Sequence, residues 1–310
     1  MNINRNDLID ILKEEEIDER LLKEIDDFRK FYKLDDSVMD RVASPRFIYY
    51  GSDVWNKAIT AILSGFHILL SGPKATGKNV LSENLSLLFN RPMWTVSLNV
   101  NTDAESLIGS DTFKSGEVTL KKGPVYECAE FGGFGILDEI NMAKNETLSV
   151  IHSALDYRRV IDVPGYNRLK LHEATRFIAT MNHGYIGTRD LNEALVSRFL
   201  VINMPTIEKK YLKKILKVEG ELKDEYVELF SQFFEDLQEK SLNSEISSKS
   251  IDLRGLISAL ELMKRGLSIK NSLEMGLMDK SFDSYEKEIV MDVYRTLFSS
   301  TINPGDIFVR

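Results

Sequence analysis

The sequence predicts an α/β core with a parallel sheet covered by helices, preceded by a short helical segment and followed by an all-helical domain. Three observations predict this fold. Short apolar runs alternate with amphipathic segments between residues 45 and 205. Proline is absent and glycine is rare between residues 206 and 303, which favours helix. Apolar residues also recur at helical spacing in the first 44 residues. We therefore expect three regions, 1–44, 45–205 and 206–310.

The middle region should contain the sheet. Apolar runs of strand length, bounded by Gly, Asp or Asn, lie at 67–71, 94–98, 134–138 and 176–180. Helical segments at 52–65, 79–89 and 145–157 lie before and between them. Strands that alternate with helices form a parallel sheet covered on both faces.

Both flanking regions should be helical. In the C-terminal region, apolar residues recur every three or four positions at 207–218, 224–240, 251–266 and 285–300. Leu8, Leu12, Ile25 and Phe28 belong to the same kind of pattern near the N-terminus. The N-terminal segment has two interpretations, a small helical cap with solvated charges or a helix that docks a partner.

Composition narrows the function classes. The net charge of −8 argues against a broad nucleic-acid surface, although a local basic groove remains open. No apolar run approaches the roughly 18 residues of a membrane helix, and the acidic N-terminus does not resemble a secretory signal. The single cysteine, Cys128, excludes an internal disulfide and a multi-cysteine metal site, and the histidines show no metal-ligand spacing. These features suit the cytoplasm.

Residues 72–79, GPKATGKN, match the G-x-x-x-x-G-K pattern of a phosphate-binding loop except at the position that follows Lys78. A predicted strand enters the loop and a predicted helix leaves it. The glycines let backbone N–H groups curl around a phosphate, and the helix N-terminus adds positive partial charge. Lys78 can reach the β- and γ-phosphates. We expect nucleotide binding by Gly72, Pro73, Lys74, Ala75, Thr76, Gly77, Lys78, Asn79 and Val80.

A second element completes such a site. FGILDEIN is an apolar strand that ends in two acids, about 60 residues after the loop. Asp138 would lie at the carboxyl end of the strand, where α/β sheets bind ligands, and would hold Mg²⁺ directly or through water. Glu139 would orient and deprotonate the attacking water.

Asn79 occupies the position where Ser or Thr is expected. The usual hydroxyl gives Mg²⁺ one oxygen ligand, and an Asn amide oxygen is also acceptable to a hard cation. Asn79 is therefore a candidate metal ligand with Asp138. Its larger size predicts weaker metal binding, and a decayed site is the alternative.

With these motifs in place, residues 46–265 resemble AAA+ ATPases, specifically the MoxR group and its CbbQ and NorQ relatives. RFIATMN resembles the strand that ends in a polar sensor residue, here Asn182. GTRDLNEALVSRF, residues 187–199, resembles the segment that carries the arginine finger, here Arg198. SIDLRGLISAL resembles the start of the lid helix with a second sensor arginine, here Arg254. The resemblance implies ATP or ADP with Mg²⁺, and a purine near Ile48, Tyr49 and Tyr50.

Two insertions fit the same group. Residues 106–129 resemble an insert within the second core helix, with a hairpin at 116–125, and residues 158–177 resemble a hairpin before the sensor strand. Such hairpins face a central pore in related machines, and plain surface hairpins are the alternative. They carry Lys114, Lys121, Lys122, Arg158, Arg159, Arg168 and Lys170.

The resemblance implies an ATP-driven remodeller that forms a ring, a hexamer in the family, and acts on client proteins with a separate von Willebrand factor A-type partner. Catalysis would use Lys78, Glu139 and Asn182, with Arg198 acting on a neighbouring subunit. Two alternatives remain. One is a nucleic-acid translocase or loader that uses the basic hairpins. The other is a nucleotide-sensing scaffold with weak hydrolysis, motivated by Asn79.

Overall fold

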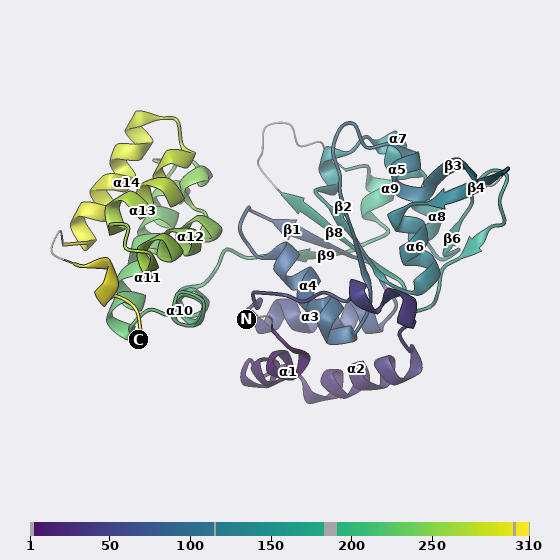
Figure 1. Cartoon of the computed structure of the whole chain (residues 1–310), viewed down its shortest axis with the longest axis horizontal. Coiled ribbons are helices and arrows are strands. Elements are labelled where there is room, and N and C mark those ends of the chain that lie inside the picture. Colours follow the sequence, from purple (N-terminus) through teal and green to yellow (C-terminus); the bar gives the residue numbers. More distant parts are fainter. Residues whose placement is uncertain (1–2, 115, 183–190, 300–301, 310) are drawn as a thin grey trace. The chain divides into compact units, whose positions relative to one another are not determined.

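The computed structural model describes residues 3–114, 116–182, 191–299 and 302–309, which form two compact units. The first unit comprises residues 1–73 and 77–205, and the second comprises 206–310 with 74–76. Figure 1 shows the first in purple to green and the second in green to yellow. Separate apolar cores stabilise the two units.

The first unit is built around a five-stranded parallel sheet in the described part of the chain (Figure 1). Its strands, in spatial order, are β2 (Met93–Ser97), β5 (Phe134–Asp138), β8 (Arg176–Asn182), β1 (Ile68–Gly72) and β9 (Leu200–Asn203). The four predicted strands are confirmed. The edge strand β9 was not predicted, although residues 199–202 form a continuous apolar run, and the structure leaves Leu200 and Val201 about half exposed.

Helices cover both faces of this sheet, and the strands show why. Ile68 and Leu70 of β1 pack into one apolar core, whereas Leu69 between them packs into the other. The same alternation separates Ile136 from Leu137 on β5. Successive side chains of a strand point to opposite faces, so a continuous apolar run requires a layer on each side.

The helices divide between these two layers. One layer contains α1 (Arg5–Glu14), α2 (Glu19–Phe31), α3 (Ser52–Leu63) and α4 (Lys78–Phe89). The other contains α5 (Ala104–Ile108), α6 (Pro124–Phe131), α7 (Asn145–Ser149), α8 (His152–Leu155) and α9 (Glu193–Val196). The single helix predicted over 145–157 is therefore two short helices. The break falls at Val150 and Ile151, whose β-branched side chains favour helix less than the flanking residues.

The N-terminal helices form a cap on the core. Leu8 and Leu12 of α1 and Ile25 and Phe28 of α2 are buried in the same core as α3 and α4. The buried Arg91 side chain holds the end of this cap, because its Nη1 donates to the carbonyl oxygen of Tyr32 at 2.8 Å. This packing agrees with the cap interpretation, and a partner-docking role for the segment stays a prediction.

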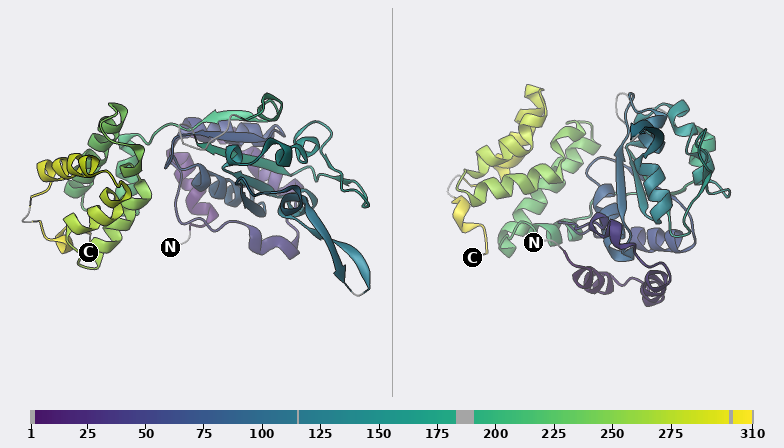
Figure 2. Two further views of the ribbon diagram at one scale, coloured as in Figure 1. Left: turned by 90° about the horizontal axis from the view of Figure 1, so that it is seen from above. Right: turned by 45° about the vertical axis from the view of Figure 1, so that its right-hand side comes forward.

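Both predicted hairpins are present. β3 (Gly109–Lys114) pairs with β4 (Glu117–Lys122) between α5 and α6, and this hairpin projects from the unit (Figure 2). It begins at residue 109 rather than 116, so the prediction placed only its second half. The shorter hairpin pairs β6 (Val160–Ile161) with β7 (Leu169–Lys170). Tyr166 joins the two insertions, since its hydroxyl donates to Asp111 Oδ1 at 2.7 Å.

The second unit is helical, as predicted. Its helices are α10 (Lys209–Val218), α11 (Asp224–Leu242), α12 (Leu253–Lys264), α13 (Ile269–Gly276) and α14 (Ser284–Leu297). Helices α12 and α13 cross at Gly255 and Gly276, where a Cβ on Gly255 would lie 2.1 Å from the Gly276 carbonyl oxygen. In the described parts of the chain, no helix combines the length and apolar character needed to cross a bilayer.

His67 ties the start of β1 to β8. Its Nδ1 accepts a hydrogen bond from the backbone N–H of Phe177 at 2.9 Å, and its side chain is only 4% exposed. Burial, with a smaller contribution from Arg159 and Arg176, lowers the pKa of His67 to about 3. The folded protein therefore keeps this imidazole neutral at pH values where an unfolded chain would protonate it.

This difference predicts an acid-sensitive stability. Between pH 6.5 and about 3 the unfolded state binds the proton and the folded state does not, so the free energy of unfolding falls as the pH falls, by about 1 kcal/mol per pH unit from His67. A His67→Asn variant should be less stable at pH 7 but lose less stability between pH 6.5 and 5. Urea unfolding can be followed by tryptophan fluorescence, since Trp55 and Trp94 both lie in the first unit. Parallel pH profiles for the two proteins would contradict this assignment.

Candidate nucleotide-binding site

The register of the parallel sheet brings the predicted site residues to one edge. Gly72, the last residue of β1, pairs with Asn182, the last residue of β8. On the other side of β8, Leu137 of β5 pairs with Ala179, which places Asp138 next to Thr180. The carboxyl ends of β1, β5 and β8 therefore meet at the edge where open α/β sheets bind ligands.

The phosphate loop connects β1 to α4. Ala75 and Gly77 have left-handed backbone conformations, with φ of 59° and 80°. Glycine is favoured at position 77 for two reasons. It adopts the left-handed backbone easily, and a Cβ there would lie 2.9 Å from the ring of Tyr49. Helix α4 begins at Lys78, and its N-cap Gly77 has no side chain to cap the first N–H groups. These N–H groups and the helix dipole make the loop suited to an anion such as phosphate.

Lys78 lies under this loop. Its Nζ donates to the carbonyl oxygens of Gly72 at 3.0 Å and Pro73 at 2.6 Å, and the side chain is buried. These two hydrogen bonds hold the ammonium group where the chain turns from β1 into the loop. A positive charge at this position complements the phosphate oxygens that the loop would bind.

Both carboxylate oxygens of Asp138 accept hydrogen bonds. The Thr180 hydroxyl donates to Oδ1 at 2.5 Å, and the Asn79 amide nitrogen donates to Oδ2 at 3.1 Å. These contacts join the end of β5 to β8 on one side and to the first turn of α4 on the other. The orientation of the Asp138 carboxylate is therefore set before any ligand binds.

Glu139 has a strained backbone. Its φ of 55° and ψ of 48° are left-handed, a conformation that costs a non-glycine residue about 1 kcal/mol. Its backbone N–H donates to Thr180 Oγ1 at 3.0 Å, which stabilises this conformation. The exposed side chain then reaches the predicted sensor residue, because Asn182 Nδ2 donates to Glu139 Oε1 at 3.3 Å. Strain of this kind is often found where a side chain must be aimed precisely.

Thr180 is a site residue that the sequence interpretation missed. It is almost fully buried and contacts Asp138 and Glu139 through one hydroxyl group. A signal was present, because Thr180 lies two positions before Asn182 and residues i and i+2 of a strand share a face.

The Asn79 side chain presents its nitrogen to Asp138, since an amide oxygen there would face the negative carboxylate. Its predicted role as a metal ligand would use the other end of the amide. Among the described residues, no group of three or more His, Cys, Asp and Glu side chains is arranged to hold a metal. The donor set fits Mg²⁺ bound by Asp138 together with phosphate oxygens, as is usual for this ion.

Arg198 lies near the amino ends of the strands, opposite the carboxyl ends that carry the other predicted site residues. It precedes β9 by two residues, and Leu200, the first residue of β9, pairs with Ile68, the first residue of β1. Gly72 lies four residues after Ile68 on β1. Given the rise per residue of a strand, the two residues are about 13 Å apart. The structure therefore does not bring Arg198 to the edge that carries Lys78 and Glu139.

The predicted purine residues lie beside the loop. Tyr49 is buried, its ring packs against Gly77, and its backbone N–H donates to Asn84 Oδ1 at 2.8 Å. Tyr50 is partly buried in the same core, as is Val80 of α4. Arg254 belongs to the second unit, where it is exposed at the start of α12 and its N–H donates to Asp252 Oδ1 at 3.0 Å. Its predicted role at a nucleotide stays a prediction.

Several basic residues of the hairpins have acidic partners. Lys122 Nζ lies 2.6 Å from Glu130, and Arg168 Nη2 lies 2.9 Å from Asp162. Arg158 is paired with Asp156. These ion pairs compensate three of the seven basic residues named above, and the nucleic-acid alternative stays a prediction. The Lys114 side chain and residues 187–190 lie outside the described residues.

Thr180 provides a test of this geometry. A Thr180→Val variant keeps the shape but removes the hydroxyl, so Asp138 loses a donor and the partly buried N–H of Glu139 loses its acceptor. We expect a stability loss of about 1–2 kcal/mol and at least about tenfold slower nucleotide hydrolysis. Thr180→Ser, which keeps the hydroxyl, is the matched control. Equal hydrolysis by the Val and Ser variants, measured by phosphate release, would contradict this role.

Comparisons with known proteins show what this chain is similar to. Residues 67–199 match the model of the AAA domain, dynein-related subfamily. The chain is 37% identical over 247 residues to the uncharacterized protein YojN of Bacillus subtilis. The aligned region covers 78% of this chain and 81% of that protein. It is 35% identical to the uncharacterized protein SH1500 of Staphylococcus haemolyticus, covering 81% and 98%. A crystal structure from Cytophaga hutchinsonii aligns with a TM-score of 0.46 and 16% identity, covering 94% of this chain and 99% of that chain.

Proposed function

The chain belongs to the family of AAA-domain proteins that includes YojN, and on that premise we propose that it is a Mg²⁺-dependent ATPase of the MoxR type that works as a ring. One observation carries the proposal. Lys78, Asp138, Glu139 and Asn182 lie at one edge of the sheet, beside a loop shaped for phosphate, whereas Arg198 lies at the other edge.

The residues of the first edge support hydrolysis. Lys78 and the N–H groups of α4 would bind the β- and γ-phosphates of ATP. Asp138, and Asn79 after rotation of its amide, would hold Mg²⁺, which neutralises phosphate charge when bound. Glu139 would orient a water molecule and accept its proton, and the Asn182 amide would keep the Glu139 carboxylate in position.

Arg198 supports a shared active site. Charge accumulates on the γ-phosphoryl oxygens during transfer, and an arginine supplied by a neighbouring subunit contributes about 10³–10⁵ in rate. Because Arg198 is about one strand length from the loop of its own chain, a second copy of the chain is the natural recipient. We propose that the copies close into a ring, a hexamer by resemblance to the MoxR group.

The remaining parts of the proposal follow from that resemblance. Arg254 and the helical second unit would respond to the nucleotide state, and their movement would be the mechanical output. The output would act on client proteins together with a separate von Willebrand factor A-type partner. A single cysteine, buried and free, suits a reducing compartment, so we propose a cytoplasmic location.

The proposal predicts Mg²⁺-dependent ATP hydrolysis whose specific activity rises with protein concentration. Glu139→Gln should bind a fluorescent ATP analogue normally but hydrolyse ATP at least about 100-fold more slowly. Arg198→Ala should lose a similar factor without losing nucleotide affinity. Arg295→Ala, which removes an exposed arginine of α14, is the control and should match the wild type. Activity that is independent of concentration, or unchanged in Arg198→Ala, would contradict a shared site.

A second candidate function rests on Asn79. Because its amide already occupies one oxygen of Asp138, the site could bind nucleotide and signal without efficient hydrolysis. Under our proposal, Asn79→Thr should change turnover by less than about tenfold, since Thr offers the same hydrogen bond and one metal ligand. Steady-state ATPase measurements over a range of Mg²⁺ concentrations test this. A much larger gain in turnover would favour the nucleotide-sensing scaffold.

A further inference from the structure

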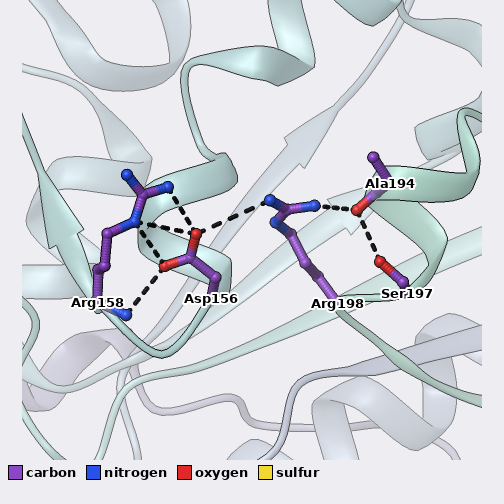
Figure 3. Close-up of polar contacts among 5 residues, drawn as sticks. All are labelled: Asp156, Arg158, Ala194, Ser197 and Arg198. Atoms are coloured by element: carbon purple, nitrogen blue, oxygen red, sulfur yellow. Dashed lines mark hydrogen bonds and ion pairs between the residues drawn. The ribbon is translucent and has the colours of Figure 1, made fainter.

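Arg198 makes two contacts within its own subunit (Figure 3). Its Nη1 donates to the carbonyl oxygen of Ala194, one turn earlier in α9. Its Nη2 lies 3.8 Å from Oδ2 of Asp156, the residue that ends α8. The Nε atom is buried and has no hydrogen-bond partner among the described residues. The direction of the guanidinium plane therefore depends on the two Nη contacts.

Asp156 is itself held firmly. The backbone N–H of Arg158 donates to its Oδ1 at 2.9 Å, and the Arg158 side chain adds a contact of 2.7 Å from Nη2 to Oδ2 (Figure 3). The Asp156 side chain is only 14% exposed, whereas that of Arg158 is 52% exposed. Hydrogen bonding to Arg158 lowers the pKa of Asp156, with a smaller contribution from Arg198, so the carboxylate stays charged at neutral pH.

Among the described residues, the chain contains a second copy of this local pair, with no third residue paired to its aspartate. Asp18 and Arg20 form the same i to i+2 arrangement, with a backbone hydrogen bond of 2.9 Å and paired contacts from the guanidinium to both carboxylate oxygens. The aspartate–arginine pair is therefore a general local structure. The feature specific to Asp156 is that Arg198, from a segment about 40 residues later, also approaches Oδ2, the oxygen that Arg158 Nη2 contacts.

We propose that Asp156 is the positioning residue for Arg198, so that the arginine is aimed at the neighbouring subunit before nucleotide arrives. This inference rests on the proposed role of Arg198 in a shared site. A free arginine side chain has many rotamers, and holding it in one reduces the entropy lost when it meets the γ-phosphate. At 3.8 Å the ion pair orients the group without taking its hydrogen-bond donors, so several N–H groups stay available for phosphate oxygens.

Arg158 supports this arrangement in two ways. Its positive charge offsets the Asp156 charge, so that Arg198 keeps positive charge to present to a phosphate. It also keeps Asp156 paired if Arg198 shifts during catalysis. His152 adds no competing charge here, because burial and the nearby Arg198 lower its pKa.

The test compares Asp156→Asn with Asp18→Asn in the full-length protein. Each variant removes the charge of one aspartate–arginine pair and keeps an acceptor for the backbone. We expect Asp156→Asn to lower kcat about tenfold with an unchanged KM for ATP and unchanged assembly in size-exclusion chromatography. Asp18→Asn should match the wild type. In an Arg198→Ala background, Asp156→Asn should cause no further loss, since it acts through Arg198.

Mixing subunits of two variants gives an activity measurement that a purely structural defect would not change. Glu139→Gln subunits have an inactive site but an intact Arg198, whereas Asp156→Asn subunits have an intact site. Mixed assemblies should therefore exceed the summed activities of the two separate variants, as should mixtures of Glu139→Gln with Arg198→Ala. Full or increased activity of Asp156→Asn, or an equal loss in both backgrounds, would overturn the positioning role alone. Full activity of Arg198→Ala would overturn the shared site and this inference with it.

Discussion

The parallel register of β1, β5 and β8 is the constraint on which the site depends. It pairs Gly72 with Asn182 and places Asp138 beside Thr180, so the phosphate loop, the two acids and Asn182 lie together at the carboxyl ends of these strands. Burial enforces this register, because the strands have apolar side chains on both faces and a slip by one residue would exchange the two cores. His67 adds a polar constraint at the start of β1, where it accepts a hydrogen bond from Phe177. The packing of the sheet thus determines the chemistry at its edge.

Hydrogen bonds at that edge make the acids one rigid group. The Thr180 hydroxyl contacts the Asp138 carboxylate and the Glu139 backbone, and Asn182 contacts the Glu139 side chain. The energetic cost of the left-handed Glu139 backbone is offset by the hydrogen bond from its N–H to Thr180. Such preorganisation is how phosphoryl transfer is accelerated, since positioning and electrostatics supply most of the effect.

The same sheet keeps apart the two groups of residues that the proposed hydrolysis requires. The ends of β1, β5 and β8 carry the nucleotide side, and the start of β9 carries Arg198 with Asp156. A subunit built in this way has its phosphate loop and its arginine on different edges. Assembly would then do more than bring copies together, because each copy would complete the site of the next. The cap formed by α1 and α2 packs on the layer of α3 and α4.

The sequence by itself determined the α/β core, the helical second unit, the phosphate loop and the acids after β5. These signals are local, since apolar periodicity and glycine spacing reflect a backbone and its neighbours in the chain. Only the tertiary structure decided the rest. β9 forms by pairing with β1, and Thr180 reaches Asp138 because β5 lies beside β8. Asp156 contacts Arg198 only through the packing of α8 and α9. Contacts between residues distant in the chain depend on the register and layering of the whole sheet, and no local pattern contains that information.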